Sequence, residues 1–132
     1  MTDLDDAGPG GPVVSDPGTM WHVTVTVAGS AVPTIEIRSG LERLEHEHPF
    51  LLAGRYAPDR AEVRYWEEAP DAESVVRLAL RLWEEHQVSA ALPHWDVVGV
   101  EVVDRETFHR RVVNGPHGRQ VAPVAVIGVT AF

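Results

Sequence analysis

The sequence predicts an α+β domain of the ferredoxin-like kind: a βαββαβ sandwich whose four-stranded antiparallel sheet carries two helices on one face, followed by an apolar C-terminal extension. Two observations predict it. Strand-like alternation and helix-like apolar spacing follow one another between residues 21 and 103 in the order strand, helix, strand, strand, helix, strand. The length of 132 residues also suits one domain with a single core.

The first strand and the first helix are predicted from residues 21–28 and 34–47. In the strand, valines alternate with His22, Thr24 and Thr26. The helix has apolar side chains three and four residues apart, and it is expected to end before Pro49, because proline disfavours a helical conformation in the preceding residue. Gly40 costs this helix about 1 kcal/mol relative to alanine and is interpreted as a point of close packing on the sheet.

A hairpin and the longest helix are predicted from residues 50–87. The strands 50–57 and 61–65 are joined by the polar turn Pro58-Asp59-Arg60. Asp71 is the expected N-cap of the helix, in which apolar residues recur at three- and four-residue steps up to about Gln87. The second strand of this hairpin and the helix are expected to form the centre of the core.

The fourth strand is predicted over residues 95–103, with Val98, Val100 and Val102 on one face. Asp104 is then expected to cap a short helix, in which Phe108 packs back onto the domain. Together these elements define a domain over residues 20–113.

Both ends of the chain differ in composition from this domain. Residues 1–19 combine Asp, Gly and Pro with almost no large apolar side chains, which predicts a disordered acidic tail. The tail is interpreted either as a solubilising segment or as an artefact preceding a true start at Met20. Residues 114–132 form an apolar segment, predicted to be an edge strand from Val124 because Pro123 disfavours a central strand. Packing on its own domain and contact with a partner subunit both remain open.

Composition excludes several classes of chemistry. The chain has no cysteine, so it forms no disulfide, thiolate metal site or thiol nucleophile. All eleven of its basic residues are arginine, which excludes catalysis by lysine. The formal net charge of −9 disfavours binding to nucleic acid. No leader and no apolar run long enough to span a membrane is seen, so a cytoplasmic location is expected.

The best candidates for a ligand or interface site come from strand alternation. If the valines of the first strand face the helices, the residues between them lie on the opposite, open face of the sheet. The candidates expected there, including one histidine and one tryptophan, are His22, Thr24, Arg64, Trp66 and Glu101.

Metal, cofactor and catalytic signatures are weak. His46 and His48 are the densest pair of candidate metal ligands, but on a helix their rings diverge by roughly 200°. They do not form the His-Glu-x-x-His pattern, and no phosphate-binding loop or nucleophile motif is present. We therefore predict no metal, no cofactor and no catalytic residue.

The leading hypothesis is a small non-enzymatic interaction or regulatory domain. It is expected to self-associate through its open sheet face and its apolar C-terminal segment, with a homo-oligomer or another protein as partner. The alternative is a cofactor-independent enzyme or small-ligand binder of the dimeric α+β barrel type, using His22, Arg64 and Trp66.

Overall fold

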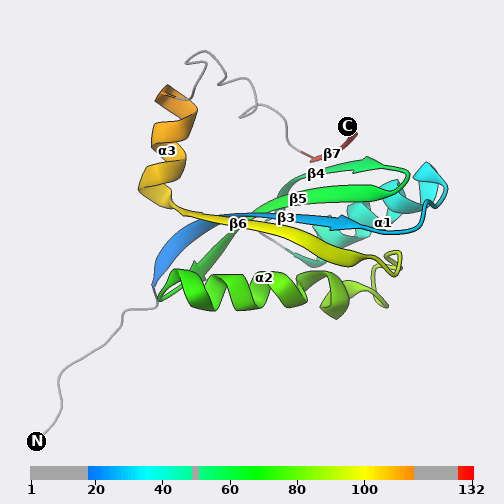
Figure 1. Cartoon of the computed structure of the whole chain (residues 1–132), viewed down its shortest axis with the longest axis horizontal. Coiled ribbons are helices and arrows are strands. Elements are labelled where there is room, and N and C mark those ends of the chain that lie inside the picture. The colour runs from blue at the N-terminus through cyan, green and yellow to red at the C-terminus, as the bar shows by residue number, and fades with distance from the viewer. Residues whose placement is uncertain (1–17, 49–50, 115–127) are drawn as a thin grey trace, which may run out of the picture.

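The structure is a computed structural model that describes residues 18–48, 51–114 and 128–132. These residues form five strands and three helices (Figure 1). In chain order they are β3 (Thr19–Ala28), α1 (Thr34–Glu47), β4 (Leu51–Ala57), β5 (Arg60–Ala69), α2 (Ala72–His86), β6 (Asp96–Asp104), α3 (Arg105–Asn114) and β7 (Gly128–Ala131).

The strands form one sheet in the order β6-β3-β5-β4-β7. Three pairs are antiparallel, whereas β7 lies parallel to β4. The predicted ferredoxin-like fold class, with four antiparallel strands and two helices, is therefore wrong. The protein has an α+β fold with a five-stranded mixed sheet and three helices, because β7 adds a parallel strand beside β4 and α3 extends the chain after β6.

The core lies between the sheet and the helices α1 and α2. On β3, Val23, Val25 and Val27 are completely or almost completely buried, and on β5 they pair with Tyr65, Val63 and Ala61. The helices contribute the other large core side chains: Ile37, Leu41, Leu44, Val75, Leu82 and Trp83. Strand alternation leaves the second face of the sheet, which we call the far face, on the side where α3 stands (Figure 1).

The two predicted long helices are confirmed. Helix α1 has the predicted bounds, and α2 begins directly after Asp71, whose carboxylate accepts the Ser74 N–H at 2.8 Å. The interpretation of Gly40 needs correction. It is buried, but a Cβ at this position would lie 3.1 Å from the Leu92 side chain, so the close contact is with the loop after α2 rather than with the sheet.

The predicted face of β6 is wrong for one residue. Thr26 pairs with Gly99 and Val27 pairs with Val97, which leaves Val98 as the extra residue of a β-bulge. Val97 therefore packs on the core side, while Val98 is 63% exposed. The bulge changes the phase of the strand, so simple alternation assigned Val98 to the core face incorrectly.

The described part of the C-terminal segment packs on its own domain. Strand β7 lies at one edge of the sheet, Val129 packs against the core, and the Phe132 N–H donates to the Tyr56 carbonyl at 2.9 Å. The predicted strand start at Val124 lies outside the described residues, as do residues 1–17 of the predicted tail. Thr19, assigned to that tail, is the first residue of β3. No helix among the described residues is long and apolar enough to cross a membrane.

Candidate functional site

The far face carries all five residues that the sequence singled out. His22 on β3 pairs with Trp66 on β5, and Thr24 pairs with Arg64. On its other side Thr24 pairs with Glu101 of β6. Paired residues of neighbouring strands point to the same face, so the strand register brings the five together as expected. Their capacity to bind a ligand or a partner depends on how exposed and how charged these side chains are.

An aromatic cluster closes the α3 end of the far face. Asp104 accepts the Thr107 N–H at 2.7 Å and so caps α3, which confirms its predicted role. The helix stacks the Phe108 ring on the His22 ring, with 4.2 Å between centroids and 30° between the ring planes. Trp66 lies edge-on to both, at 5.2 Å from His22 and 5.0 Å from Phe108. The predicted packing of Phe108 on the domain is thus confirmed.

His22 is covered by this cluster and is only 7% exposed. Burial, with a further contribution from the Arg64 charge, lowers the pKa of His22 to about 4. The imidazole is therefore neutral at pH 7, and the Phe108 ring lies over it. Both observations favour a packing role for His22 over a role as a proton acceptor from a substrate.

Charged side chains occupy the rest of the far face. The Arg111 guanidinium of α3 contacts the Glu101 carboxylate at 3.0 Å. Arg64 Nε lies 3.5 Å from Glu62 Oε1, within ion-pair distance, yet neither of these two buried atoms has a hydrogen-bond partner among the described residues.

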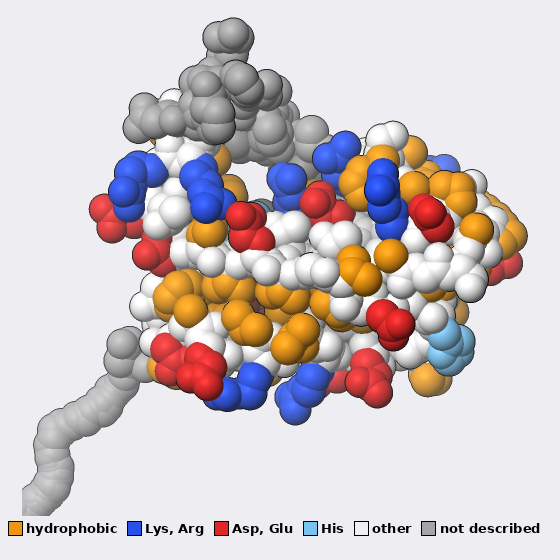
Figure 2. Space-filling model, viewed as in Figure 1, with side chains coloured by type: hydrophobic (Ala, Val, Ile, Leu, Met, Phe, Trp, Pro, Cys, Tyr) orange, Lys and Arg blue, Asp and Glu red, His pale blue; other side chains and the backbone are white. Residues whose placement is uncertain are grey.

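A second pair of arginines lies near the C-terminus. The guanidinium groups of Arg55 on β4 and Arg60 on β5 stack on the Phe132 ring, at 4.8 and 5.1 Å from its centroid. Figure 2 shows the molecule hollowed between α3 and the opposite end of the far face, with basic side chains on both sides of the hollow.

The outer edge of β6 is a second candidate surface. Strands β6 and β7 are the two edges of the sheet formed by the described residues, and β6 has nine residues where β7 has four. Below β6, Figure 2 shows a cluster of hydrophobic side chains between this strand and α2. Leu80 of α2 is half exposed there. Beside Leu80, a shallow hollow of about 390 Å³ lies between α2 and the start of β6 and is lined in part by Trp83, Trp95 and Val97.

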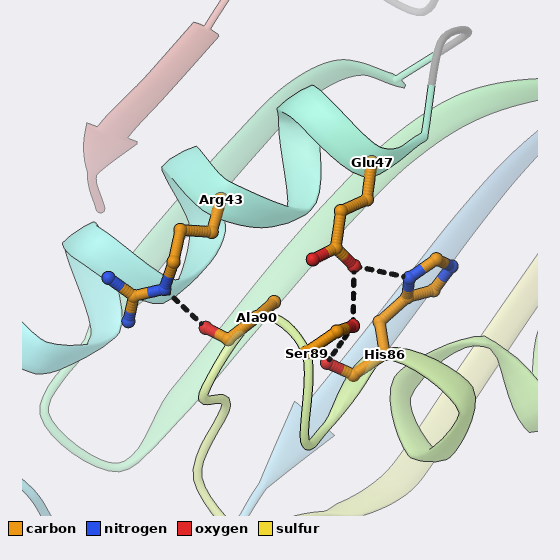
Figure 3. A network of polar contacts seen from close by, with 5 residues as sticks. All are labelled: Arg43, Glu47, His86, Ser89 and Ala90. Carbon is orange, nitrogen blue, oxygen red and sulfur yellow. Dashed lines mark hydrogen bonds and ion pairs between the residues drawn. The ribbon is translucent and has the colours of Figure 1, made fainter.

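A polar network joins α1 to the end of α2 (Figure 3). Glu47 Oε1 accepts the Ser89 hydroxyl at 2.8 Å and contacts His86 Nδ1 at 2.7 Å. These contacts hold the pKa of Glu47 below its usual range, the Ser89 hydrogen bond having the largest effect. A serine, a histidine and a glutamate meet here, but the serine hydroxyl donates to the Glu47 carboxylate and, at 3.5 Å, to the His86 backbone carbonyl, and not to the imidazole ring. This is not the geometry of an activated nucleophile.

The two candidate metal ligands are separated. His46 Nδ1 lies 2.9 Å from the Glu42 carbonyl oxygen on the surface of α1, whereas the His48 ring packs against Tyr65 at 4.7 Å. In the described parts of the chain, no three His, Cys, Asp or Glu side chains lie close enough together to hold a metal ion.

Sequence reasoning missed three members of these surfaces. Arg55 of β4 lies on the far face of the sheet, but a β-bulge between Leu51 and Ala53 interrupts the alternation of faces from which its side could have been predicted. Phe132 is placed by the parallel pairing of β7, for which its own short segment gives no signal. Val98 is exposed by the bulge in β6.

A comparison with known families identifies part of the chain. Residues 20–119 match a family described as a domain of unknown function, DUF8830. The chain belongs to this family. The DUF8830 match contains both candidate surfaces up to α3, including all five predicted site residues, whereas β7 and Phe132 lie beyond it. No curated protein matches the sequence.

Proposed function

We propose that this protein is a non-enzymatic interaction domain that self-associates by pairing the β6 edges of two copies. The observation that carries the proposal is the long valine-rich edge strand beside exposed apolar side chains of α2. The proposed contact differs from the one predicted from the sequence, which used the open sheet face and the C-terminal segment. Helix α3 covers one end of the far face, and β7 already pairs with β4 of its own chain.

The backbone of an edge strand has N–H and C=O groups free to pair with another strand. Proteins usually protect such edges with short strands, charged side chains or bulges. The β7 edge is short, with four residues. The β6 edge has five valines and, between its terminal aspartates, only one charged residue, Glu101. Its bulge protects one end and leaves the part from Gly99 onward regular. An edge of this kind favours pairing with another strand.

The β6 sequence favours a second copy as the pairing strand. It reads DVVGVEVVD, which is the same in both directions except that Gly99 and Glu101 exchange places. An antiparallel pair centred on Val100 therefore places Val100 opposite Val100 of the partner subunit, and Glu101 opposite Gly99 of the partner subunit. Like charges meet only at the strand ends, where the N-terminus of α3 offsets the charge of Asp104.

Helix α2 extends this surface. It packs against the same side of the sheet as the core valines of β6, so a two-fold axis through the β6 pair brings the α2 helices of both copies together. Leu80, half exposed in one chain, would lie in that contact. Burial of apolar surface at the contact would add to the backbone hydrogen bonds.

The enzymatic alternative has less support from the described residues. In a dimeric α+β barrel two sheets enclose a pocket with their open faces, but α3 stands on the far face of this sheet (Figure 1). His22, its candidate proton carrier, is buried beneath Phe108.

Size-exclusion chromatography with light scattering tests the proposal. The 14.5 kDa chain should elute at twice its mass, and Val98→Lys should weaken the dimer at least tenfold, because a lysine on an edge strand opposes pairing. Leu80→Glu should act in the same direction through the α2 contact.

Ile35→Lys is the matched control. Ile35 lies on α1, and its exposure of 62% nearly equals the 63% of Val98, so both substitutions place a lysine at an equally exposed position. This variant should remain dimeric. A monomeric wild type at 100 μM, or a Val98→Lys variant that dimerises as tightly as Ile35→Lys, would refute pairing through β6.

A further inference from the structure

We infer that the far face binds an organic anion, a carboxylate or sulfonate attached to a flat apolar group, with Arg64 as the anchor for the acid. This inference rests on the charges and contacts of the far face and not on the β6 edge, so it holds whether the protein is a monomer or a dimer.

The charge of this face opposes that of the chain. From Arg60 to Arg64, β5 turns two arginines and Glu62 onto the far face, and β4 adds Arg55 opposite Glu62. Among these four residues three guanidinium groups face one carboxylate, and the Glu101 carboxylate of the same face is paired with Arg111, although the whole chain has a formal charge of −9. Such a local reversal of charge attracts anions to this face.

Arg64 has unused capacity for hydrogen bonding. Its Nε is buried, and Glu62 Oε1, with which it forms an ion pair, is 3.5 Å away, beyond a good hydrogen bond. A guanidinium offers five N–H donors in a planar fork that matches the two oxygens of an acid group. About a third of the Arg64 side chain is exposed, so a ligand in solvent can reach it.

Flat apolar surfaces lie near this cation. Trp66 follows on the same face of β5, and its ring forms part of the aromatic cluster with Phe108. The cross-strand neighbours of Arg64 are Thr24 on one side and the small Ala53 on the other, and Gly128 continues the row. No atom of the described residues lies within 4 Å of where a side chain would begin at Gly128.

These features define the class of ligand. A bare inorganic anion would use Arg64 and leave Trp66 without a role, and a neutral apolar compound would leave the guanidinium without an acceptor. A ligand with both parts satisfies both, since aromatic groups stack on tryptophan while the acid pairs with arginine.

Fluorescence titration of the full chain with 1-anilinonaphthalene-8-sulfonate tests the inference, because this probe combines a sulfonate with aromatic rings and emits strongly when bound. Arg64→Gln should raise its Kd at least tenfold, since a charge-assisted hydrogen bond is lost. Arg77→Gln, on the exposed surface of α2 where Arg77 pairs with Glu73 at 3.2 Å, should leave the Kd within twofold.

A neutral analogue, N-phenyl-1-naphthylamine, separates charge recognition from general hydrophobic binding. It should bind wild type and Arg64→Gln equally, and Trp66→Ala should weaken both probes. Arg55→Gln, at a partly exposed position on the same face, provides a second test and should weaken the sulfonate about threefold. Equal sulfonate binding by wild type, Arg64→Gln and Arg55→Gln, or an equal loss of both probes in Arg64→Gln, overturns the inference.

Discussion

His22 illustrates how one residue can look functional in the sequence and be structural in the fold. A histidine on the open face of a sheet, next to an arginine and a tryptophan, is typical of a ligand site. In the structure the Phe108 ring covers it, and burial is the main cause of its lowered pKa. His22 therefore acts as a flat, neutral side chain that holds α3 against the sheet.

The protonation of His22 links α3 to pH. The charged groups facing it are Arg64, Glu101 and Arg111. Its pKa is 6.5 in the unfolded chain and about 4 in the folded chain, so between these values the unfolded state binds more protons. Stability should consequently fall as the pH drops from 7 to 5, by about 2 kcal/mol from this residue.

Urea unfolding of His22→Phe at pH 7 and pH 5, followed by tryptophan fluorescence, measures this contribution. Phenylalanine keeps the stack on Phe108 and takes up no proton, so the variant should lose clearly less stability on acidification than wild type. His48, whose pKa is also lowered by burial, supplies a residual dependence of the same sign. An equal pH dependence in both proteins would show that His22 is solvated.

The elements differ in how strongly they are held. Helix α2 contributes four buried residues to the core, and α1 contributes Ile37, Gly40, Leu41 and Leu44. None of residues 105–113 of helix α3 is fully buried, and the helix depends on the Phe108 stack, the Arg111–Glu101 ion pair and its Asp104 cap. Exposed ion pairs contribute little, so the cap and the ring contact carry most of its attachment.

Loss of the cap should therefore release α3 alone. Asp104→Ala removes the acceptor of the Thr107 N–H and costs about 1 kcal/mol. Hydrogen exchange over residues 107–112 should become about fivefold faster while the core strands keep their protection. Asp71→Ala removes the same kind of cap from α2, which is packed into the core, so that variant should lower global stability instead. Unchanged exchange in α3 of Asp104→Ala would show that the cap is dispensable.

How much the sequence could predict also depends on the type of element. The helices and the β4–β5 hairpin follow from local signals such as apolar spacing and the caps Asp71 and Asp104, and they are confirmed. Alternation likewise placed His22, Thr24, Arg64, Trp66 and Glu101 on one face. It could not show that Phe108 would cover His22, because the choice between sheet faces for α3 depends on packing distant in the sequence.

The fold class failed for the same reason at the scale of the whole molecule. A four-residue strand such as β7 has almost no periodicity of its own, and nothing in GVTA indicates a parallel partner. The pairing of β7 depends on β4. Gly54 of β4 has no side chain and leaves room beside Leu41, and the Val129 side chain of β7 fills that room, 3.8 Å from where a Cβ of Gly54 would lie. Long-range complementarity of this kind is absent from any single segment.

Because β7 completes the sheet beside β4, its removal should affect the whole molecule. Deletion of residues 128–132 exposes the outer edge of β4 and uncovers core side chains around Leu41, so we expect the free energy of unfolding to fall by roughly 2 kcal/mol and Tm to fall by several degrees.

The newly exposed β4 edge should also favour association. The same deletion made in the Val98→Lys variant should therefore self-associate, whereas Val98→Lys alone should not. Phe132→Ala is the control: it removes only the ring beneath Arg55 and Arg60, worth about 0.5–1 kcal/mol, and keeps the edge covered. Circular dichroism melting and light scattering on these variants measure both effects, and a deletion that leaves Tm and mass unchanged would mean that β7 does not close this edge in solution.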